Sequence, residues 1–473
     1  MQRVRKLYDA QAQGVERFVA SHDKRLILAY GTGCGKTPTA ISALKAVLTN
    51  PDPRILVVCP AIVRLHWVHE FGVWAGWSAE PIEMGRHRTS GTKKALKARD
   101  AAYANPIQVT SYDLMGDVDP TGWDAIVFDE IHHLSDCTSK QSRMAQALMR
   151  ANPGVPALGL SATLIPTDIW QLWHPMHLLF GSTWGKFPRA GKICWDFVGR
   201  YCDLIKNEYG TAVGAPKASR QSELRNRVLK VAHRLNREDI AKNLPPIDAT
   251  LLRVPGLGLA RNLHAVGKRT SGRPEVAHAV EWYRSLEADI SHAVVLCYHR
   301  DVATALCESL KPHLKDTEIF RIDGSMPSAE RVAVLANAEQ AKSAVLVATS
   351  ESIREGVRLM WAQKVLFAEW RQSPAQVVQV LGRFYSVGDS RRPQLQVLYD
   401  ESLYGQAWTL MHRMGAVNKL LEGGNTERTV EEVFSPAEIT DERLEELTRA
   451  MLSTHKLRDE AWTEESESEE DAW

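Results

Sequence analysis

Short runs of consecutive apolar residues recur in two parts of the chain, separated by longer segments that mix apolar and charged residues. The first part has such runs at Leu26–Ala29, Ile55–Cys59, Ile107–Thr110, Ala125–Phe128 and Ala157–Leu160. A second series follows at Ala293–Tyr298, Ile319–Ile322, Ala344–Ala348, Val365–Phe367 and Leu395–Tyr399. Apolar runs that alternate with helix-like segments are typical of parallel sheets covered by helices on both faces. The pattern therefore predicts an α/β protein with two lobes.

The segments outside the two series set the expected domain boundaries. Residues near 181–250 have no clear period and end in Leu244-Pro245-Pro246, where the prolines would stop a helix. From Ser435 to Leu457, apolar residues recur at helical spacing, and Ser435-Pro436 suits the start of a helix. We therefore divide the chain into lobe one (1–180), an insert or hinge (181–250), lobe two (251–425), a brace-helix region (426–462) and an acidic, disordered tail (463–473).

The charge balance is nearly neutral but uneven. The 473 residues include 58 Lys and Arg against 57 Asp and Glu, for a net charge of +1. Six of the acids lie between Glu464 and Asp471, and without them the net charge would be about +7. Basic stretches lie at Arg86 to Arg99 and Lys217 to Arg237. A tail that competes for a basic groove is a secondary hypothesis.

Targeting signals and cysteine pairs are not evident in the sequence. No apolar run approaches the ~20 residues of a membrane span, and the start of the chain lacks a secretory signal. The seven cysteines form no CxxC pair and read as reduced core thiols, which favours a cytoplasmic protein. Among the tryptophans, Trp67, Trp74 and Trp77 are open to two interpretations, base stacking or core packing, and we favour core packing.

The first apolar run leads into a glycine-rich turn that contains Gly33 and ends Gly35-Lys36-Thr37. Glycines let backbone N–H groups curl around a phosphate, and the next helix adds its positive N-terminal end. Lys36 is then placed for the β- and γ-phosphates of a nucleotide, and the Thr37 hydroxyl for Mg²⁺. One residue departs from the general pattern: Tyr30 stands in the place of its first glycine.

The fourth apolar run delivers Asp129-Glu130-Ile131-His132 at its carboxyl end. Ligands of parallel sheets bind at the carboxyl ends of strands, so these acids should lie beside the glycine-rich turn. Asp129 is then a partner for Mg²⁺, and Glu130 orients and activates the attacking water. A helix start with an acidic first turn is the simpler alternative, but the turn upstream makes it the weaker one.

Further motifs follow in a fixed order. Leu160-Ser161-Ala162-Thr163 completes the first series, and the second contains Val347-Ala348-Thr349-Ser350, Gly356 and a segment from Gln379 to Arg383. This ordered set resembles the superfamily 2 helicases, and within them the Swi/Snf-type double-stranded DNA translocases. The resemblance implies two tandem RecA-like lobes, parallel sheets flanked by helices, with a helical insert and a C-terminal brace helix.

Finer likenesses extend over roughly residues 7–415. Gln11–Val15 resembles the adenine-reading segment of the family. Val58–Glu70 and Val109–Asp113 resemble two of its DNA-facing segments, and Arg321–Ser325 resembles the opening of its lobe two. Phe197–Asp203 and Phe367–Pro374 resemble the annealing-helicase, or fork-remodelling, branch.

The resemblance implies ATP and Mg²⁺ as cofactors and assigns roles to single residues. The implied catalytic residues are Lys36, Glu130 and Arg383. Nucleotide contacts are implied for Gln11, Gly33, Gly35, Lys36, Thr37, Asp129, Gly356 and Gln379, of which Thr37 and Asp129 also hold the metal. Coupling of the nucleotide state to DNA is implied for His132, Ser161 and Thr163, and phosphate contacts for Ser111, Tyr112, Ser325, Thr349 and Ser350. Packing for His132 and helix capping for Ser161 and Thr163 are the simpler alternatives.

The last motif departs from the family. Ser386 stands where a second arginine is usual, and Asp389 where glutamine is usual. Either Arg383 suffices, or Arg391 or Arg392 substitutes, or hydrolysis is slow.

The sequence thus predicts a DNA-dependent ATPase that moves along or remodels duplex or forked DNA, with RNA a less favoured partner and no membrane association. We expect a stripped-down, bacterial or viral type of motor. Two alternatives stay open: a catalytically weak nucleic-acid clamp, and the motor subunit of a larger restriction or defence complex.

Overall fold

The computed structural model describes most of lobe one and much of lobe two. The described residues are 6–31, 33–162, 164–165, 169–188, 191, 193–207, 210–235, 237–240, 249–253, 274–287, 289–353, 357–369, 380, 383–384 and 393–399. The expected brace helix and acidic tail lie outside them, as do Thr163, Gly356, Gln379, Ser386 and Asp389.

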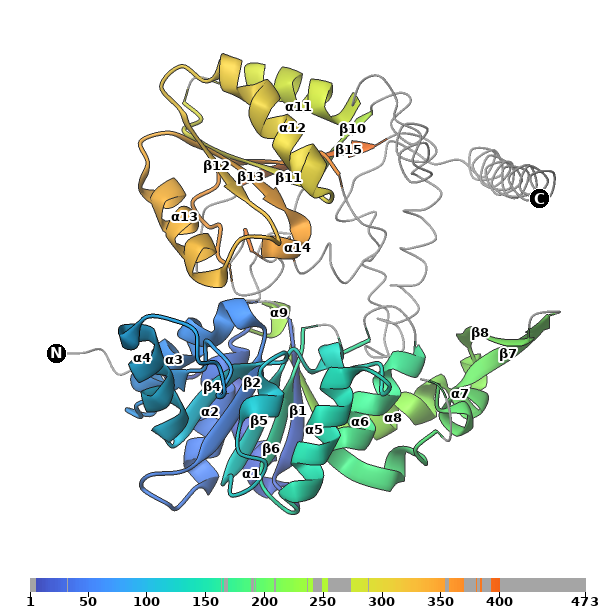
Figure 1. Ribbon diagram of the computed structural model, residues 1–473. Helices are drawn as coiled ribbons and strands as arrows, with labels where there is room; N and C mark the ends of the chain where they lie inside the picture. The colour runs from blue at the N-terminus through green and yellow to red at the C-terminus, as the bar shows by residue number, and fades with distance from the viewer. Residues whose placement is uncertain are drawn as a thin grey trace, which may run out of the picture.

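A parallel sheet of seven strands forms lobe one, in the order β3-β4-β2-β5-β6-β1-β9 (Figure 1). Its strands are β1 (Arg25–Tyr30), β2 (Ile55–Cys59), β3 (Glu80–Pro81), β4 (Ile107–Ser111), β5 (Ala125–Asp129), β6 (Ala157–Leu160) and β9 (Ala232–Leu235). All five predicted strands are present. Every residue of β2, β4, β5 and β6 is buried, which is why these strands are continuous apolar runs in the sequence.

Helices cover both faces of this sheet. One face packs on α1 (Asp9–Ala20), α2 (Lys36–Val47) and α3 (Arg64–Trp74). The other packs mainly on α5 (Lys140–Ala151) and α6 (Trp173–Phe180). The remaining helical elements of this part are η1 (Ala61–Val63), α4 (Lys93–Ala104), η2 (Met115–Asp117), η3 (Ile131–Leu134), η4 (Ile169–Leu172) and η5 (Gly181–Trp184).

The expected insert has more structure than its lack of period indicates. It contains α7 (Trp195–Tyr201), an antiparallel hairpin of β7 (Cys202–Asn207) and β8 (Gly210–Pro216), η6 (Ala218–Arg220), α8 (Gln221–Val231) and α9 (Arg237–Ile240). The hairpin extends outward beside α7 in Figure 1. Between α8 and α9, β9 returns to the lobe-one sheet and pairs in parallel with β1. The insert is therefore not only helical, and one of its strands belongs to lobe one.

Lobe two is a second parallel sheet, of six strands in the order β10-β15-β14-β11-β13-β12. Its elements are β10 (Ala249–Arg253), α11 (Pro274–Arg284), β11 (His292–Cys297), α12 (Arg300–Leu310), η7 (Lys311–His313), β12 (Glu318–Ile322), α13 (Ser328–Gln340), β13 (Ala344–Thr349), α14 (Ser350–Ile353), β14 (Lys364–Phe367) and β15 (Gln394–Tyr399). Apolar clusters lie on both of its faces. The predicted two-lobe α/β fold is confirmed. None of the described helices is long and apolar enough to cross a bilayer.

Candidate active site

The glycine-rich turn joins the end of β1 to the start of α2. Gly33 and Gly35 have φ angles of 80° and 78°, in the left-handed region that other residues rarely adopt. A Cβ on Gly35 would lie 2.2 Å from Nε2 of Gln11, so a larger residue would displace the Gln11 amide. The Gln11 amide donates to the Cys34 carbonyl at 2.9 Å, and this bond ties α1 to the turn. The predicted nucleotide residues Gln11, Gly33 and Gly35 are thus brought together.

Tyr30, the departure from the family pattern, points away from the turn. Its side chain is fully buried, and its hydroxyl lies 2.8 Å from Nδ1 of His233 on β9. A Cβ on Gly14 of α1 would lie only 2.1 Å from the same hydroxyl. Burial raises the pKa of Tyr30, so the phenol stays protonated. The tyrosine packs between α1 and β9 and leaves the glycines to shape the turn.

Lys36, the first residue of α2, faces the acids at the end of β5. Its Nζ lies 3.7 Å from Oε1 of Glu130 and donates to the Tyr30 carbonyl at 3.3 Å. The Lys36 side chain is 13 % exposed and that of Glu130 is 8 % exposed. Thr37 follows in the first turn of the same helix and is partly buried. The predicted cation and the predicted base are therefore neighbours.

Glu130 has a strained backbone and a strongly stabilised charge. Its φ of 53° and ψ of 52° are left-handed, which is uncommon for a residue with a Cβ. Burial alone would raise the pKa of this carboxyl, but the charges of Lys36 and Arg383 and a hydrogen bond with His132 lower it well below its usual range. Glu130 is consequently ionised, as a base for water must be.

The carboxylate of Asp129 is fixed by its neighbours. Trp67 Nε1 donates to Asp129 Oδ2 at 2.8 Å, and the Glu130 amide donates to Oδ1 at 3.0 Å. The hydroxyl of Tyr112 donates to the Asp129 carbonyl at 2.8 Å. Trp67 is fully buried, so base stacking by this residue is wrong. Its role as the orienter of Asp129 was missed, although Trp67 lies in a segment that carries the family resemblance.

His132 and Ser161 join the β5 and β6 loops. His132 Nδ1 lies 3.0 Å from Ser161 Oγ and 3.3 Å from Glu130 Oε2, and Ser161 Oγ donates to Glu130 Oε2 at 3.4 Å. The His132 ring stacks on His133 and His133 on Tyr112, with centroids 5.0 and 5.1 Å apart. Two of the three predicted coupling residues, His132 and Ser161, therefore contact the predicted base, Glu130. The third, Thr163, lies outside the described residues.

Arg383 lies in a turn of lobe two, and its positive charge helps to lower the pKa of Glu130. The expected DNA contacts differ in how accessible they are. Ser325 is exposed, and its Oγ donates to Asp323 Oδ1 at 2.5 Å. Ser350 Oγ donates to the Cys297 carbonyl at 3.1 Å.

The other three expected DNA contacts, Ser111, Tyr112 and Thr349, are buried. The hydroxyls of Tyr112 and Thr349 already bond within the protein, the latter to Ser352 at 2.5 Å. DNA contact stays a prediction for all five residues.

The residues present fit a magnesium ion held largely by phosphates and water. No group of three or more His, Cys, Asp or Glu side chains in the described chain is arranged to hold a metal alone. Mg²⁺ in nucleotide sites typically takes one or two protein oxygens and keeps several waters. A single oriented carboxylate, that of Asp129, and the hydroxyl of Thr37 at the start of α2 are protein oxygens of the kind and number that this coordination takes.

Comparison with known proteins agrees with this arrangement. Residues 10–257 match the SNF2-related domain, and residues 278–388 match the helicase conserved C-terminal domain. The chain belongs to the SNF2-related family. The expected superfamily 2, Swi/Snf-type assignment is confirmed, and the β9 strand falls inside the first matched domain.

Two relatives illustrate this SNF2-related similarity. The SWI/SNF-related matrix-associated actin-dependent regulator of chromatin subfamily A-like protein 1 of Xenopus tropicalis is 25% identical over 418 residues, covering 82% of this chain and 42% of its own length. The DNA annealing helicase and endonuclease ZRANB3 of Bos taurus is 22% identical over 499 residues, covering 95% of this chain and 44% of its own. The chain thus spans less than half the length of these relatives. Both are eukaryotic and give no support to the expected bacterial or viral type.

A solved structure shows the shared fold. Dbp5 of S. cerevisiae bound to RNA and ADP BeF3 superposes with a TM-score of 0.53 at 14% identity, covering 94% of each chain. At that identity the likeness concerns the two-lobe fold alone, which is the fold expected of an SNF2-related helicase-like motor.

Proposed function

We propose that this SNF2-related protein is a DNA-dependent ATPase that moves along or remodels duplex or forked DNA. The observation that carries the proposal is the 3.7 Å ion pair between Lys36, at the start of α2, and Glu130, at the end of β5, with the charge of Arg383 from lobe two helping to lower the pKa of Glu130. Phosphoryl transfer depends on positioning and on charge stabilisation, and these three groups supply both. The names of the relatives, one of them a DNA annealing helicase, favour DNA as the polymer.

Each residue of the site has a definite part in hydrolysis. The glycine turn and Lys36 hold the phosphates, so Lys36 must exchange its contact with Glu130 for one with the nucleotide. Glu130, ionised by its neighbours, orients the attacking water and accepts its proton. Arg383 stabilises the charge that develops on the transferred phosphoryl group, which requires the two lobes to close.

Thr37 and Asp129 are the residues that would hold Mg²⁺. When bound, the metal would neutralise negative charge on the phosphates of the nucleotide. The hydrogen bond from Trp67 keeps the Asp129 carboxylate in one orientation for that purpose.

The β5–β6 network links hydrolysis to DNA. His132 and Ser161 both contact Glu130, and the Tyr112–His133–His132 stack extends from there toward the end of β4. A change at Glu130 during turnover therefore reaches the segment that contains Ser111, an expected phosphate contact. Such contacts position a strand without reading its sequence.

The test is ATP hydrolysis by the purified protein without polymer and with duplex DNA, forked DNA, single-stranded DNA or RNA. We expect stimulation mainly by duplex or forked DNA and no turnover by Lys36→Ala, which keeps the native circular dichroism spectrum. Full activity of Lys36→Ala would refute the phosphate-loop assignment. Stimulation by RNA alone would refute the choice of DNA.

A catalytically weak clamp is the second candidate, because Ser386 stands where the family usually has an arginine. Retained ATP and DNA binding without turnover on any polymer would favour it. Turnover that appears only with a co-purifying nuclease would favour a motor subunit of a larger defence complex. A cytoplasmic location also stays a prediction.

A further inference from the structure

A basic segment on lobe one takes no part in the site described above. Residues 86–99 contain six Lys and Arg residues and no Asp or Glu. The segment forms the loop after β3 and most of α4, which packs against β3 at the edge of the lobe-one sheet. The buried residues Ala102 and Tyr103 of α4 belong to the apolar cluster on the face that carries α5 and α6, opposite α3. Four of its cationic side chains are exposed, and we call them the α4 basic platform: Arg88, Lys93, Lys94 and Lys97.

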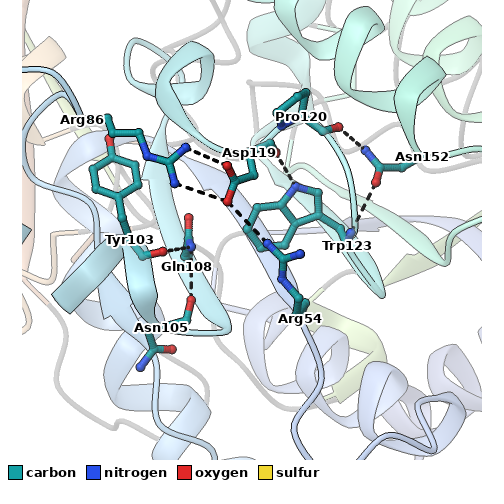
Figure 2. Close-up of polar contacts among 9 residues, drawn as sticks. All are labelled: Arg54, Arg86, Tyr103, Asn105, Gln108, Asp119, Pro120, Trp123 and Asn152. Carbon is teal, nitrogen blue, oxygen red and sulfur yellow. Dashed lines mark hydrogen bonds and ion pairs between the residues drawn. The ribbon is translucent and has the colours of Figure 1, made fainter. Parts of the chain in front are cut away.

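The loop that leads into the platform is anchored by charge (Figure 2). Arg86 forms a 2.7 Å ion pair with Asp119, which also lies 3.5 Å from Arg54. The Arg86 guanidinium lies 5.1 Å from the centre of the Tyr103 ring, and Arg54 lies 5.0 Å from that of Trp123. The hydrogen bond from Arg86 lowers the pKa of Asp119, so the pair stays charged.

The helix of the platform is anchored as well. Thr92 caps α4, its side chain accepting from the Ala95 amide at 3.2 Å. Arg99 donates to the Arg88 carbonyl and forms a 2.5 Å ion pair with Asp100. Arg86 and Arg99 thus hold the segment in place, while the four platform cations are left to face solvent.

The platform cations have no acidic partner within the described chain. No ion pair there involves Arg88, Lys93, Lys94 or Lys97. Lys93 and Lys97 are one helical turn apart, a spacing at which like charges repel. A polyanion laid along the helix would relieve that repulsion, and one turn, about 6 Å, is close to the span of two phosphates on one DNA strand.

The position of α4 suits a polymer that also crosses the motor. As a connection between the parallel strands β3 and β4, α4 runs against their direction. Its first turn, with Lys93 and Lys94, therefore lies toward the carboxyl end of β4, where Ser111 and Tyr112 are.

The described residues 74–186 give no sign of a protein partner for the platform. The described residues between Val73 and Phe187 include no exposed large hydrophobic side chain. Protein interfaces depend on buried aromatic and apolar anchors, whereas a phosphate backbone needs only positive charge.

We propose that the α4 basic platform binds the phosphate backbone of a second duplex segment, such as one arm of a forked DNA. This inference rests on the proposed function, because it adds a second DNA contact to the one along the motor. Binding at the platform is independent of sequence and sensitive to salt.

The test compares the triple variant Lys93→Ala, Lys94→Ala, Lys97→Ala with a control of equal charge change. The control, Lys311→Ala, Lys315→Ala, Lys342→Ala, removes exposed lysines near the amino ends of β12 and β13 in lobe two. Anisotropy of labelled forked DNA is measured from 50 to 300 mM salt for both variants and the unaltered protein.

We expect the slope of log affinity against log salt to become shallower by about three for the platform variant only, since each lost phosphate contact removes about one. ATP hydrolysis without DNA stays unchanged in both variants. An unchanged slope in the platform variant overturns the proposal. The proposal is also overturned if the platform variant loses binding to a peptide of the sequence TEESESEEDAW while its DNA binding is unaffected, because the platform would then bind the acidic tail. Failure of DNA to stimulate ATP hydrolysis by the unaltered protein would instead count against the proposed function. The two results are separate because the salt slopes report DNA binding and are measured without ATP turnover.

Discussion

Glu130 combines a strained backbone with three neighbours that favour its charge. A left-handed residue with a Cβ costs of the order of 1–3 kcal/mol and persists only where its surroundings hold it in place. Here β5 fixes the preceding Asp129, and Lys36 and His132 hold the carboxylate from two sides. The strain therefore lies where the chemistry needs a carboxylate aimed at one point.

Replacing Glu130 with glutamine should remove the base and leave the shape of the site. We expect kcat for ATP to fall by about 10²–10⁴-fold, the usual contribution of a positioned base, with little change in nucleotide affinity. Steady-state hydrolysis and binding of a fluorescent ATP analogue measure the two effects. Glu83→Gln, which alters an exposed carboxylate, serves as the control. Equal loss of affinity and turnover would contradict a role confined to catalysis.

His174 makes the stability of lobe one depend on pH. It is fully buried; its Nδ1 donates to the Leu134 carbonyl, and Nε2 accepts from the Gln146 amide at 2.7 Å. Both ring nitrogens are thus satisfied only when the ring is neutral. Burial lowers the pKa of His174 from 6.5 to about 4.

Between these two values the unfolded chain binds more protons than the native one, so stability falls as the pH falls. The loss from this group should reach about 2 kcal/mol at pH 5. Urea unfolding of the unaltered protein and of His174→Gln measures it: the variant should show a pH slope weaker by about one proton between pH 6 and 5. His278→Gln, at an exposed position, should keep the original slope. A similar slope in all three proteins would rule out His174 as the cause.

At the scale of elements, the end of β1 is a junction of α1, α2 and β9. Tyr30 reaches His233 on β9, and the next amide, Gly31, donates to the Leu235 carbonyl at 2.8 Å. Gly14 gives α1 the room to lie against this pair. The strand that follows the insert is thus bonded to the start of the phosphate turn.

This junction predicts a compensating pair of substitutions. Gly14→Ala should destabilise lobe one by about 1–3 kcal/mol through overpacking, although alanine normally favours a helix. Removing the obstructing hydroxyl with Tyr30→Phe should recover at least about 0.5 kcal/mol in the double variant. Chemical denaturation of the four proteins closes the cycle. Strict additivity would show that the two side chains do not meet.

The sequence predicts best those elements whose residues are determined by one local requirement, such as burial of both faces of a strand or a positive φ angle. The lobe strands are apolar because both faces are buried, and Gly33 and Gly35 are required by positive φ angles, so both were predictable. The β9 sequence AHRL has no such run, because His233 and Arg234 are only partly buried, and its pairing with β1 depends on contacts made far along the chain. The bond from Trp67 to Asp129 was missed for the same reason: it joins residues 62 positions apart.

At the scale of the whole molecule, contacts between the lobes meet near the site. Ile62 of η1 packs against an apolar cluster of lobe two, and the positive charge of Arg383 in that lobe helps to lower the pKa of Glu130. The backbone of Arg383 is held on both sides, by a bond from its amide to Val380 and one from Leu359 to its carbonyl. Closure of the lobes could therefore move Arg383 toward the nucleotide while these two backbone bonds are kept.

Arg383→Ala tests whether a single arginine from lobe two is enough. An arginine that stabilises the transferring phosphoryl group contributes about 10³–10⁵-fold to turnover, so we expect kcat to fall in that range while ATP affinity stays nearly the same. Hydrolysis in saturating forked DNA and titration with an ATP analogue give the two numbers. Arg284→Ala, an exposed arginine on α11, is the control for charge. A fall in kcat of less than tenfold would mean that another arginine, such as Arg391 or Arg392, stabilises the phosphoryl group. That arginine would replace the second arginine that the family usually has where Ser386 stands. A large loss of affinity with normal turnover would mean that Arg383 binds the ground state and that closure of the lobes is not what drives hydrolysis.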